Sequence, residues 1–346
     1  MPQANRLGGL NGIETMMFAR STAIIMLSYG LLATLGCSKT QSPDQLKELN
    51  RQLIQAVGHH DLDTTRRLLD KGANIETTST DGNDTTLLGI AARDADLAMA
   101  KLLLQRGAKA HVKDHSLVTP LMHAAYGGHT EIVRVLLKQN PDQIEKNEAL
   151  LEAAHGGSAV VIIEEPNKDH PGRDSISRER ILSEASSPWV ETVKLVLDSG
   201  ADIEAKDEYR GPPLVDAAAY AQTDVVLLLL QKGANLHARD KYGNTALIAA
   251  SCECAVATMN DAYDVVKVLL DRGSDVNARS NSGTTALMNA AGGFGGSAIV
   301  KLLLDHGADP RARDSEGRTA LKYAMQENRE DKVSLLKQAL AKAHKR

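Results

Sequence analysis

The sequence predicts an all-α solenoid of about eight stacked helix-turn-helix repeats. Leucine-rich runs end six times in one short pattern, in which Gly is followed by Ala or Ser and then by a mostly polar residue. These patterns begin at Gly72, Gly107, Gly200, Gly233, Gly273 and Gly307. Two of the intervals between the glycines are 33 and 34 residues, a period typical of stacked helical repeats. Aromatic residues make up only 3% of the chain, so we expect a core of Leu, Ala and Val.

Each repeat carries start and stop signals for two helices. In the fullest copy, the hydroxyl of Thr119 is suited to cap a helix N-terminus, and Pro120 suits the first turn. The Ala pair at 124–125 lets two helices approach closely, and the apolar residues within 132–137 give the second helix a buried stripe. The glycine that follows a second helix supplies the left-handed residue that ends it. Because one such unit cannot bury its own apolar face, neighbouring units must stack.

This third copy, residues 114–137, resembles the ankyrin repeat, with Thr-Pro-Leu at 119–121, Ala-Ala at 124–125 and Gly-His-Thr-Glu-Ile-Val at 128–133. Other copies keep a subset of the motif, with Thr-Ala-Leu at 245–247, 285–287 and 319–321. The resemblance covers roughly nine-tenths of the chain and places an ankyrin repeat domain at 42–346. It implies a β-turn finger before each first helix and a structural role for His129.

The two ends of the repeat domain carry distinct signals. Ser42-Pro43-Asp44-Gln45 has the pattern of a capping box at the start of the first helix. The last repeat has Lys332, Ser334 and Lys337 where other repeats are apolar, and we expect these polar side chains to face water as a terminal cap.

Residues 1–36 do not fit the repeat and resemble a bacterial lipoprotein signal peptide. A basic residue, Arg20, precedes an apolar run over 23–35, and Gly36 then precedes Cys37. Residues 1–15 look like an upstream start-site extension, because Met16 is the more natural start. The resemblance implies lipidation of Cys37, with 37–41 forming the lipidated cysteine and a short linker. Thr34 departs from the leucine preferred there. An uncleaved membrane anchor or ordinary cleavage at this point are the alternatives.

Three changes of length fall at the turn between the two helices of a repeat. Repeat four carries an insertion at about 158–188, and its second helix resumes at Trp189. Repeat six carries extra residues around 252–261, with its second helix resuming near Asp264, and repeat seven adds one residue within 292–296. The finger before repeat four is shortened, with the repeat opening at Glu148, which suggests a local kink.

The residues suggest no catalytic group, metal site or cofactor. The histidines do not recur at ligand spacing, and the pair Cys252 and Cys254 cannot complete a zinc site. Removing residues 1–36 changes the formal charge from −4 to −5, and this mildly acidic chain with no basic stripe argues against nucleic acid as a partner.

The favoured interpretation is a non-enzymatic protein-binding scaffold: a monomeric envelope lipoprotein, membrane-bound through its lipid, facing the periplasm, and on the outer membrane if the source is Gram-negative. The family resemblance implies that a protein partner contacts the finger tips and the face of the first helices. These positions are His123, Tyr126, Glu208, Tyr209, Arg210, Asp216, Tyr220, Lys241, Tyr242, Asn281, Ser282, Ser315 and Glu316. The alternatives are an accessory or redox-protective component of an enzyme using the Cys252 and Cys254 loop, or a cytoplasmic adaptor if the signal is unused.

Overall fold

The computed structural model describes residues 42–156, 187–208, 210–252, 259–293 and 297–343. The chain divides into a unit of residues 1–51, of which the structure describes the start of α2, and a unit of residues 52–346. Cys37, the interior of the repeat-four insertion and Cys254 lie outside the described residues. Residues 294–296, part of the turn in which repeat seven adds one residue, also lie outside them.

The described residues form helices arranged as eight consecutive pairs, each with an inner and an outer helix. The inner helices are α2 (Pro43–Gly58), α4 (Leu87–Arg93), α6 (Pro120–Tyr126), α8 (Gln143–His155), α10 (Pro213–Ala219), α12 (Ala246–Ala250), α14 (Ala286–Gly292) and α16 (Ala320–Gln326). The outer helices are α3 (Leu62–Asp70), α5 (Leu97–Gln105), α7 (Thr130–Leu137), α9 (Pro188–Asp198), α11 (Thr223–Gln231), α13 (Met259–Asp271), α15 (Ala298–Asp305) and α17 (Glu330–Ala343).

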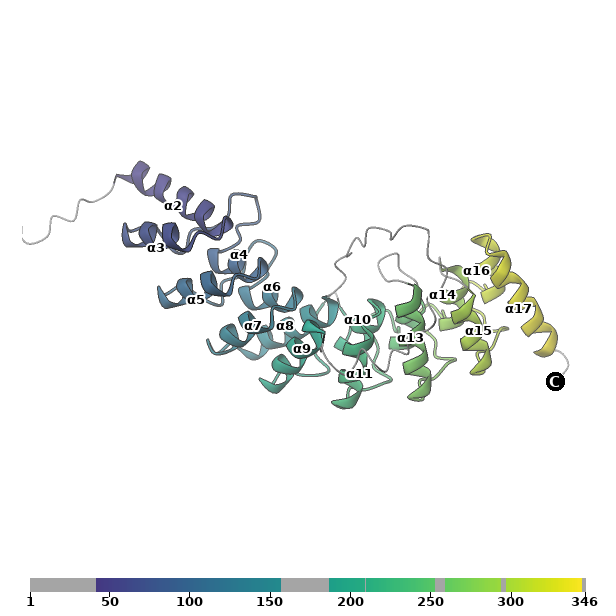
Figure 1. Cartoon of the computed structure of the whole chain (residues 1–346). Helices are drawn as coiled ribbons and strands as arrows, with labels where there is room; N and C mark the ends of the chain where they lie inside the picture. Colours follow the sequence, from purple (N-terminus) through teal and green to yellow (C-terminus); the bar gives the residue numbers. More distant parts are fainter. Residues whose placement is uncertain (1–41, 157–186, 209, 253–258, 294–296, 344–346) are drawn as a thin grey trace, which may run out of the picture. The chain divides into compact units, whose positions relative to one another are not determined.

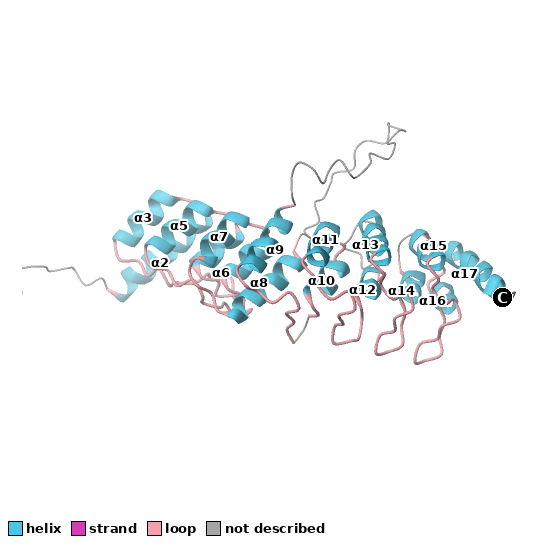
Figure 2. Ribbon diagram, turned by 90° about the horizontal axis from the view of Figure 1, so that it is seen from below, coloured by secondary structure: helices cyan, strands magenta, loops and turns pink. Residues whose placement is uncertain are grey.

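Within the second unit, each inner helix packs against the next inner helix and each outer helix against the next outer helix (Figure 1). The loops that precede α10, α12, α14 and α16 project from the same side of the stack (Figure 2). Among the described residues the structure contains no strand, and its one isolated bridge joins Thr78 and Thr86. The predicted all-α repeat solenoid is confirmed.

The start and stop signals act as the sequence predicts. Thr86, Thr119, Thr245, Thr285 and Thr319 each accept a hydrogen bond from the backbone N–H three residues on, at the start of an inner helix. The six repeat glycines have φ between 87° and 97° and follow the outer helices. At the start of α2, the Ser42 N–H donates to Gln45 Oε1 (3.0 Å) and the Gln45 N–H donates to Ser42 Oγ (3.2 Å). This reciprocal pair is the predicted capping box.

The core of the described residues contains Leu, Ala, Val, Ile and Met, and none of its buried apolar side chains is aromatic. Both alanines of the pair Ala124-Ala125 are fully buried, which lets the inner helices approach closely. The small side chains explain how these short helices pack tightly with so few rings. No helix in the described part of the chain is long and apolar enough to cross a bilayer.

The prediction for Lys332 is wrong. Ser334 and Lys337 are exposed as expected, but the Lys332 side chain is fully buried. Its Nζ donates to the carbonyl oxygens of Ala290 (2.8 Å) and Gly293 (2.9 Å), at the C-terminal end of α14 in the preceding repeat. Lys332 occupies the helix position of Ile132 and Ile299, so its stem fills an apolar site while its ammonium group meets backbone carbonyls.

Two helices begin earlier than the sequence predicts. Repeat four opens at Gln143 rather than Glu148, because the Asp142 side chain caps the helix by accepting from the Glu145 N–H (2.8 Å) and no Gly or Pro interrupts the next 12 residues. Residues that would form the finger before repeat four therefore form the first turns of α8 instead. Likewise α13 begins at Met259 instead of near Asp264, so part of the repeat-six insertion lengthens the outer helix.

Candidate protein-binding surface

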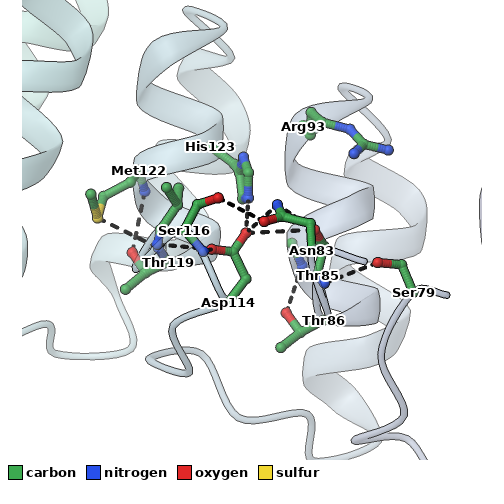
Figure 3. A network of polar contacts seen from close by, with 12 residues as sticks. Ser79, Asn83, Thr85, Thr86, Arg93, Asp114, Ser116, Thr119, Met122 and His123 are labelled. Atoms are coloured by element: carbon green, nitrogen blue, oxygen red, sulfur yellow. Dashed lines mark hydrogen bonds and ion pairs between the residues drawn. The ribbon is translucent and has the colours of Figure 1, made fainter. Parts of the chain in front are cut away.

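Buried aspartates hold the bases of the fingers. The Asp114 side chain is 1% exposed, and its Oδ1 accepts from the backbone N–H groups of Ser116 (2.9 Å) and Val118 (3.0 Å). Figure 3 shows Asp114 between His123 of its own repeat and Asn83 of the preceding one. His123 Nε2 lies 3.1 Å from Asp114 Oδ2, and Asn83 Nδ2 donates to the same oxygen (3.2 Å). His123 therefore helps to fix a finger, and its side chain is only 15% exposed.

The same arrangement recurs in later repeats. Asp240 Oδ1 accepts from the N–H groups of Tyr242 and Asn244, and Asp314 Oδ1 accepts from those of Glu316 and Arg318. Burial raises the pKa of Asp314, but hydrogen bonds from the Arg318 side chain, the backbone and the Tyr323 hydroxyl outweigh it and lower the pKa to about 2. The finger bases are thus structural, and this leaves the tips for contact with other molecules.

Neighbouring fingers are joined to one another. The Asn281 N–H donates to the Tyr242 carbonyl (2.8 Å), and the Asn281 side chain donates to the Lys241 carbonyl (3.0 Å). One repeat further, the Ser315 N–H donates to the Ser282 carbonyl (2.9 Å). Five of the predicted contact residues therefore take part in finger-to-finger hydrogen bonds, although all five stay exposed: Lys241, Tyr242, Asn281, Ser282 and Ser315.

Other predicted tip residues are open to solvent. Tyr242 is 62% exposed, with Lys241 Nζ 5.2 Å from its ring centroid, and Glu208 and Glu316 are exposed. Lys241 Nζ also donates to the Glu208 carbonyl (3.3 Å). Tyr209 lies outside the described residues.

A row of rings lies on the inner helices of repeats three to five. The ring of Tyr126 lies 5.9 Å from that of His155, and the His155 ring lies 3.9 Å from that of Tyr220, measured between centroids. Tyr126 is 46% exposed, while His155 and Tyr220 are partly buried. These side chains come from the C-terminal ends of α6, α8 and α10, so stacking brings together residues far apart in the chain.

Charged groups lie beside this row, on the same faces of α8 and α10. Arg210 Nη2 donates to Glu152 Oε1 (2.7 Å), and Glu152 itself is 8% exposed. Glu152 is one turn before His155 in α8, and Asp216 is one turn before Tyr220 in α10. Asp216 Oδ2 is buried and has no hydrogen-bond partner among the described residues. Arg210 therefore satisfies one of the two inner-face acids and leaves the other unsatisfied.

The environment changes the protonation of this surface. Burial raises the pKa of Asp216 to about 7, and the charges of Asp207, Glu152 and Asp240 raise it further, while Arg210 opposes the shift. Burial lowers the pKa of His155, as does the nearby Arg210, while Glu152 opposes this. The lowered pKa favours the neutral form of His155, and near neutral pH Asp216 is divided between its protonated and ionised forms.

The single tryptophan of the chain, Trp189, packs next to the residues that carry the row of rings. Trp189 Nε1 donates to the Tyr126 carbonyl (3.0 Å), at the C-terminal end of α6. Its ring fills the space beside Gly128 and Gly156, where an added methyl group would lie 3.2 Å and 2.6 Å from it. Gln222 Nε2 in turn donates to the Gly156 carbonyl (2.6 Å), so the end of α8 next to the insertion is also capped.

Sequence reasoning placed Tyr126, Asp216 and Tyr220 on this surface and missed Glu152, His155 and Trp189. A signal was available, because Glu152 occupies the same repeat position as His123 and Asp216, and His155 that of Tyr126. His155 fits no metal-ligand spacing, so only its repeat position points to a role. His129 has the structural role that the resemblance implies, since its Nε2 lies 3.0 Å from the Arg93 carbonyl oxygen.

Catalytic or redox groups gain no support from the described residues. No three His, Cys, Asp or Glu side chains gather there in a group that could hold a metal ion. Cys252 is exposed at the C-terminal end of α12, and Cys254 is outside the described residues.

Comparison with known proteins matches this architecture. A family model described as ankyrin repeats matches in three copies, over residues 53–148, 182–279 and 254–345. The chain is 30% identical over 143 residues (40% of its length) to "Ankyrin repeat and KH domain-containing protein mask-1" of Caenorhabditis elegans. It is 38% identical over 104 residues (29%) to "Ankyrin repeat and KH domain-containing protein mask" of Drosophila melanogaster. It is 32% identical over 129 residues (36%) to "Probable E3 ubiquitin-protein ligase XBOS33" of Oryza sativa subsp. japonica.

These matches cover 5%, 2% and 23% of the three relatives, so the likeness lies in the repeats. The family model covers most of the chain, including all of the inner helices from α4 to α16 except the C-terminal part of α8, after residue 148. Together with the stacked helix pairs and the capped fingers, the match shows that the chain belongs to the ankyrin repeat family, whose members generally serve as protein-interaction scaffolds.

Proposed function

We propose that this protein is a non-enzymatic, monomeric scaffold that binds a protein partner on the inner-helix face of repeats three to five. The observation that carries the proposal is the row of Tyr126, His155 and Tyr220 beside Arg210. Tyrosine and arginine are enriched where proteins bind one another, because they combine a large contact area with a polar tip. The positions of Tyr126 and His155 correspond to Cys252 and Gly292 in repeats six and seven, so these two repeats have no ring at that position.

A binding experiment tests this proposal. The full chain is used as bait, the captured partner is purified, and its affinity is measured by calorimetry. The double variant Tyr126→Ala and Tyr220→Ala should weaken binding at least about tenfold, since hot-spot rings contribute about 2 kcal/mol or more each. Tyr242→Ala, which removes an exposed ring from a finger tip, tests whether the partner contacts the fingers instead. If the double variant binds as tightly as the natural chain, the partner docks elsewhere.

We also propose that Cys37 is lipidated and holds the array at a bacterial envelope membrane, facing the periplasm. The support is the sequence pattern of a basic residue, an apolar run and Gly36-Cys37. Because α2 begins at Pro43, the five residues 38–42 reach at most about 17 Å and would hold the array close to the bilayer. Labelling with an alkyne fatty acid should mark the natural protein and fail with Cys37→Ser. Unchanged labelling, or recovery of the natural protein in the cytoplasmic fraction, would refute the anchor.

A further inference from the structure

Acidic side chains gather around Asp216 on the inner face of repeats three to five. The charged groups around Asp216 are Glu152 from α8, Asp207 and Arg210 from the loop before α10, and Asp240 from the loop before α12. Arg210 is the single cation among these groups, and it is engaged with Glu152. Three further cations, Lys206, Arg239 and Lys241, line a hollow with Asp207, Arg210 and Asp240 in the loops before α10 and α12. In α12, the position equivalent to Asp216 is Ala249, so the next inner helix supplies no cation.

The environment of the Asp216 carboxyl group is unfavourable for its charged form. Its Oδ2 is enclosed without a hydrogen-bond partner among the described residues, yet the residue as a whole is only partly buried. A buried acceptor without a hydrogen-bond partner is unfavourable. A cation that reached the exposed part of this residue from solvent would stabilise its ionised form, because charge-assisted hydrogen bonds are the stronger kind.

The neighbouring rings favour the same kind of group. Tyrosine faces attract Lys and Arg side chains electrostatically, and Arg also stacks on them. The lowered pKa of His155 favours the neutral form of its ring, and a neutral ring does not repel a cation.

We propose that Asp216, with the rings of Tyr126 and Tyr220, receives a Lys or Arg side chain of the partner protein. The inference rests on the proposed docking face and adds the chemistry of the segment that binds there. A basic side chain would lie over the tyrosine rings with its charged end at Asp216, while Arg210 stays on Glu152. Arginine fits best, because its planar group can stack and donate hydrogen bonds at the same time.

The test starts from a random 12-residue peptide display library selected against the full chain. Peptides are kept if they no longer bind the Tyr126→Ala, Tyr220→Ala double variant. Affinities of synthetic copies are then measured through the emission of Trp189, which is the only tryptophan and contacts the Tyr126 backbone. We expect the selected peptides to share an Arg or Lys whose replacement by citrulline or norleucine weakens binding at least about tenfold.

A matched pair of variants assigns the effect to Asp216. Asp216→Asn should weaken binding about tenfold, while Glu131→Gln, which removes an exposed acid from the outer helix α7, should leave it unchanged. Binding should also strengthen from pH 6 to pH 8, as Asp216 loses its proton, and this dependence should vanish in Asp216→Asn. Circular dichroism confirms that each variant is folded.

The failures of the two proposals are distinguishable. If no peptide depends on the tyrosines, the docking face itself is wrong. If site-dependent peptides share acidic or apolar residues instead, or if basic ones bind Asp216→Asn as tightly as the natural chain, the docking face stands and cation recognition is refuted.

Discussion

Lys332 Nζ lies 2.8 Å from the carbonyl oxygen of Ala290, so a buried lysine in the last repeat caps an inner helix of the repeat before it. The last carbonyls of a helix have no partner within that helix. After α14 the chain continues through Gly293 in an extended conformation (φ −63°, ψ 168°). Repeat seven carries its extra residue at this turn, and Lys332 supplies hydrogen bonds to the carbonyls of Ala290 and Gly293.

The first prediction concerns this cap. Lys332→Met keeps an apolar stem at a position where repeat two has Met99, but it leaves two carbonyls without their donor. We expect a loss of about 1–3 kcal/mol of stability, since orphaned buried acceptors cost more than the gain from burying a thioether. Thermal and urea unfolding measure the effect. The control is Lys337→Met, which changes an exposed lysine of the same helix and should stay within about 0.5 kcal/mol. Equal stability of the two variants would show that the cap contributes nothing.

The second prediction concerns the junction between repeats three and four. A methyl group at Gly156 would overlap the Tyr126 carbonyl oxygen and lie 2.6 Å from Trp189 Nε1, so Gly156→Ala must displace the indole ring. We expect destabilisation by about 1–3 kcal/mol, as for other overpacked sites, with a red shift of the tryptophan emission. In Gly58→Ala the new methyl group meets no atom within 4 Å, so stability should be nearly unchanged. Natural emission in a stable Gly156→Ala protein would contradict the packing described.

Local signals made most of the fold predictable. Thr119 caps the start of α6, and Gly107 follows the end of α5. Each role depends on a few adjacent residues, so the sequence alone can predict it. Lys332 was misassigned because its acceptors lie about 40 residues away, at a turn altered by one extra residue. A lysine at an apolar position of a terminal repeat has the same appearance whether it faces water or caps a neighbour.

The binding surface was predictable only in part, for a related reason. Tyr126 and Asp216 could be placed by repeat position, because every inner helix presents the same face. The contact of Arg210 with Glu152 joins residues 58 positions apart, in the loop before α10 and in α8. This pairing forms only when repeats four and five stack, so no pattern of neighbouring residues in the sequence predicts it.

The third prediction uses the raised pKa of Asp216. A carboxyl group whose pKa is about 7 when folded and 3.8 when unfolded favours folding in its protonated form. The stability of the folded chain that depends on this group is therefore fully present below about pH 4, and it is lost as the pH rises through 7. Asp216→Asn removes this dependence, so the variant should be more stable than the natural chain at pH 8, by about 2 kcal/mol after allowance for solvent screening.

The measurement is urea unfolding at pH 5 and at pH 8. The difference between Asp216→Asn and the natural chain should be larger at pH 8 than at pH 5. Glu131→Gln serves as the control for removing one negative charge. An effect of Asp216→Asn that is the same at both pH values would show that the carboxyl group titrates normally.

The fourth prediction separates structural from contact residues among the fingers. Asn281→Ala removes the side-chain hydrogen bond to the Lys241 carbonyl and should cost about 0.5–1.5 kcal/mol. Tyr242→Ala removes a ring that is 62% exposed and should change stability by less than about 0.5 kcal/mol. Thermal unfolding compares the two, and amide hydrogen exchange at Asn281 reports on the bond that its N–H donates to the Tyr242 carbonyl, which neither substitution removes directly. If Tyr242→Ala is the more destabilising change, the exposed tyrosine supports the finger, and the finger-to-finger hydrogen bonds matter less than their geometry indicates.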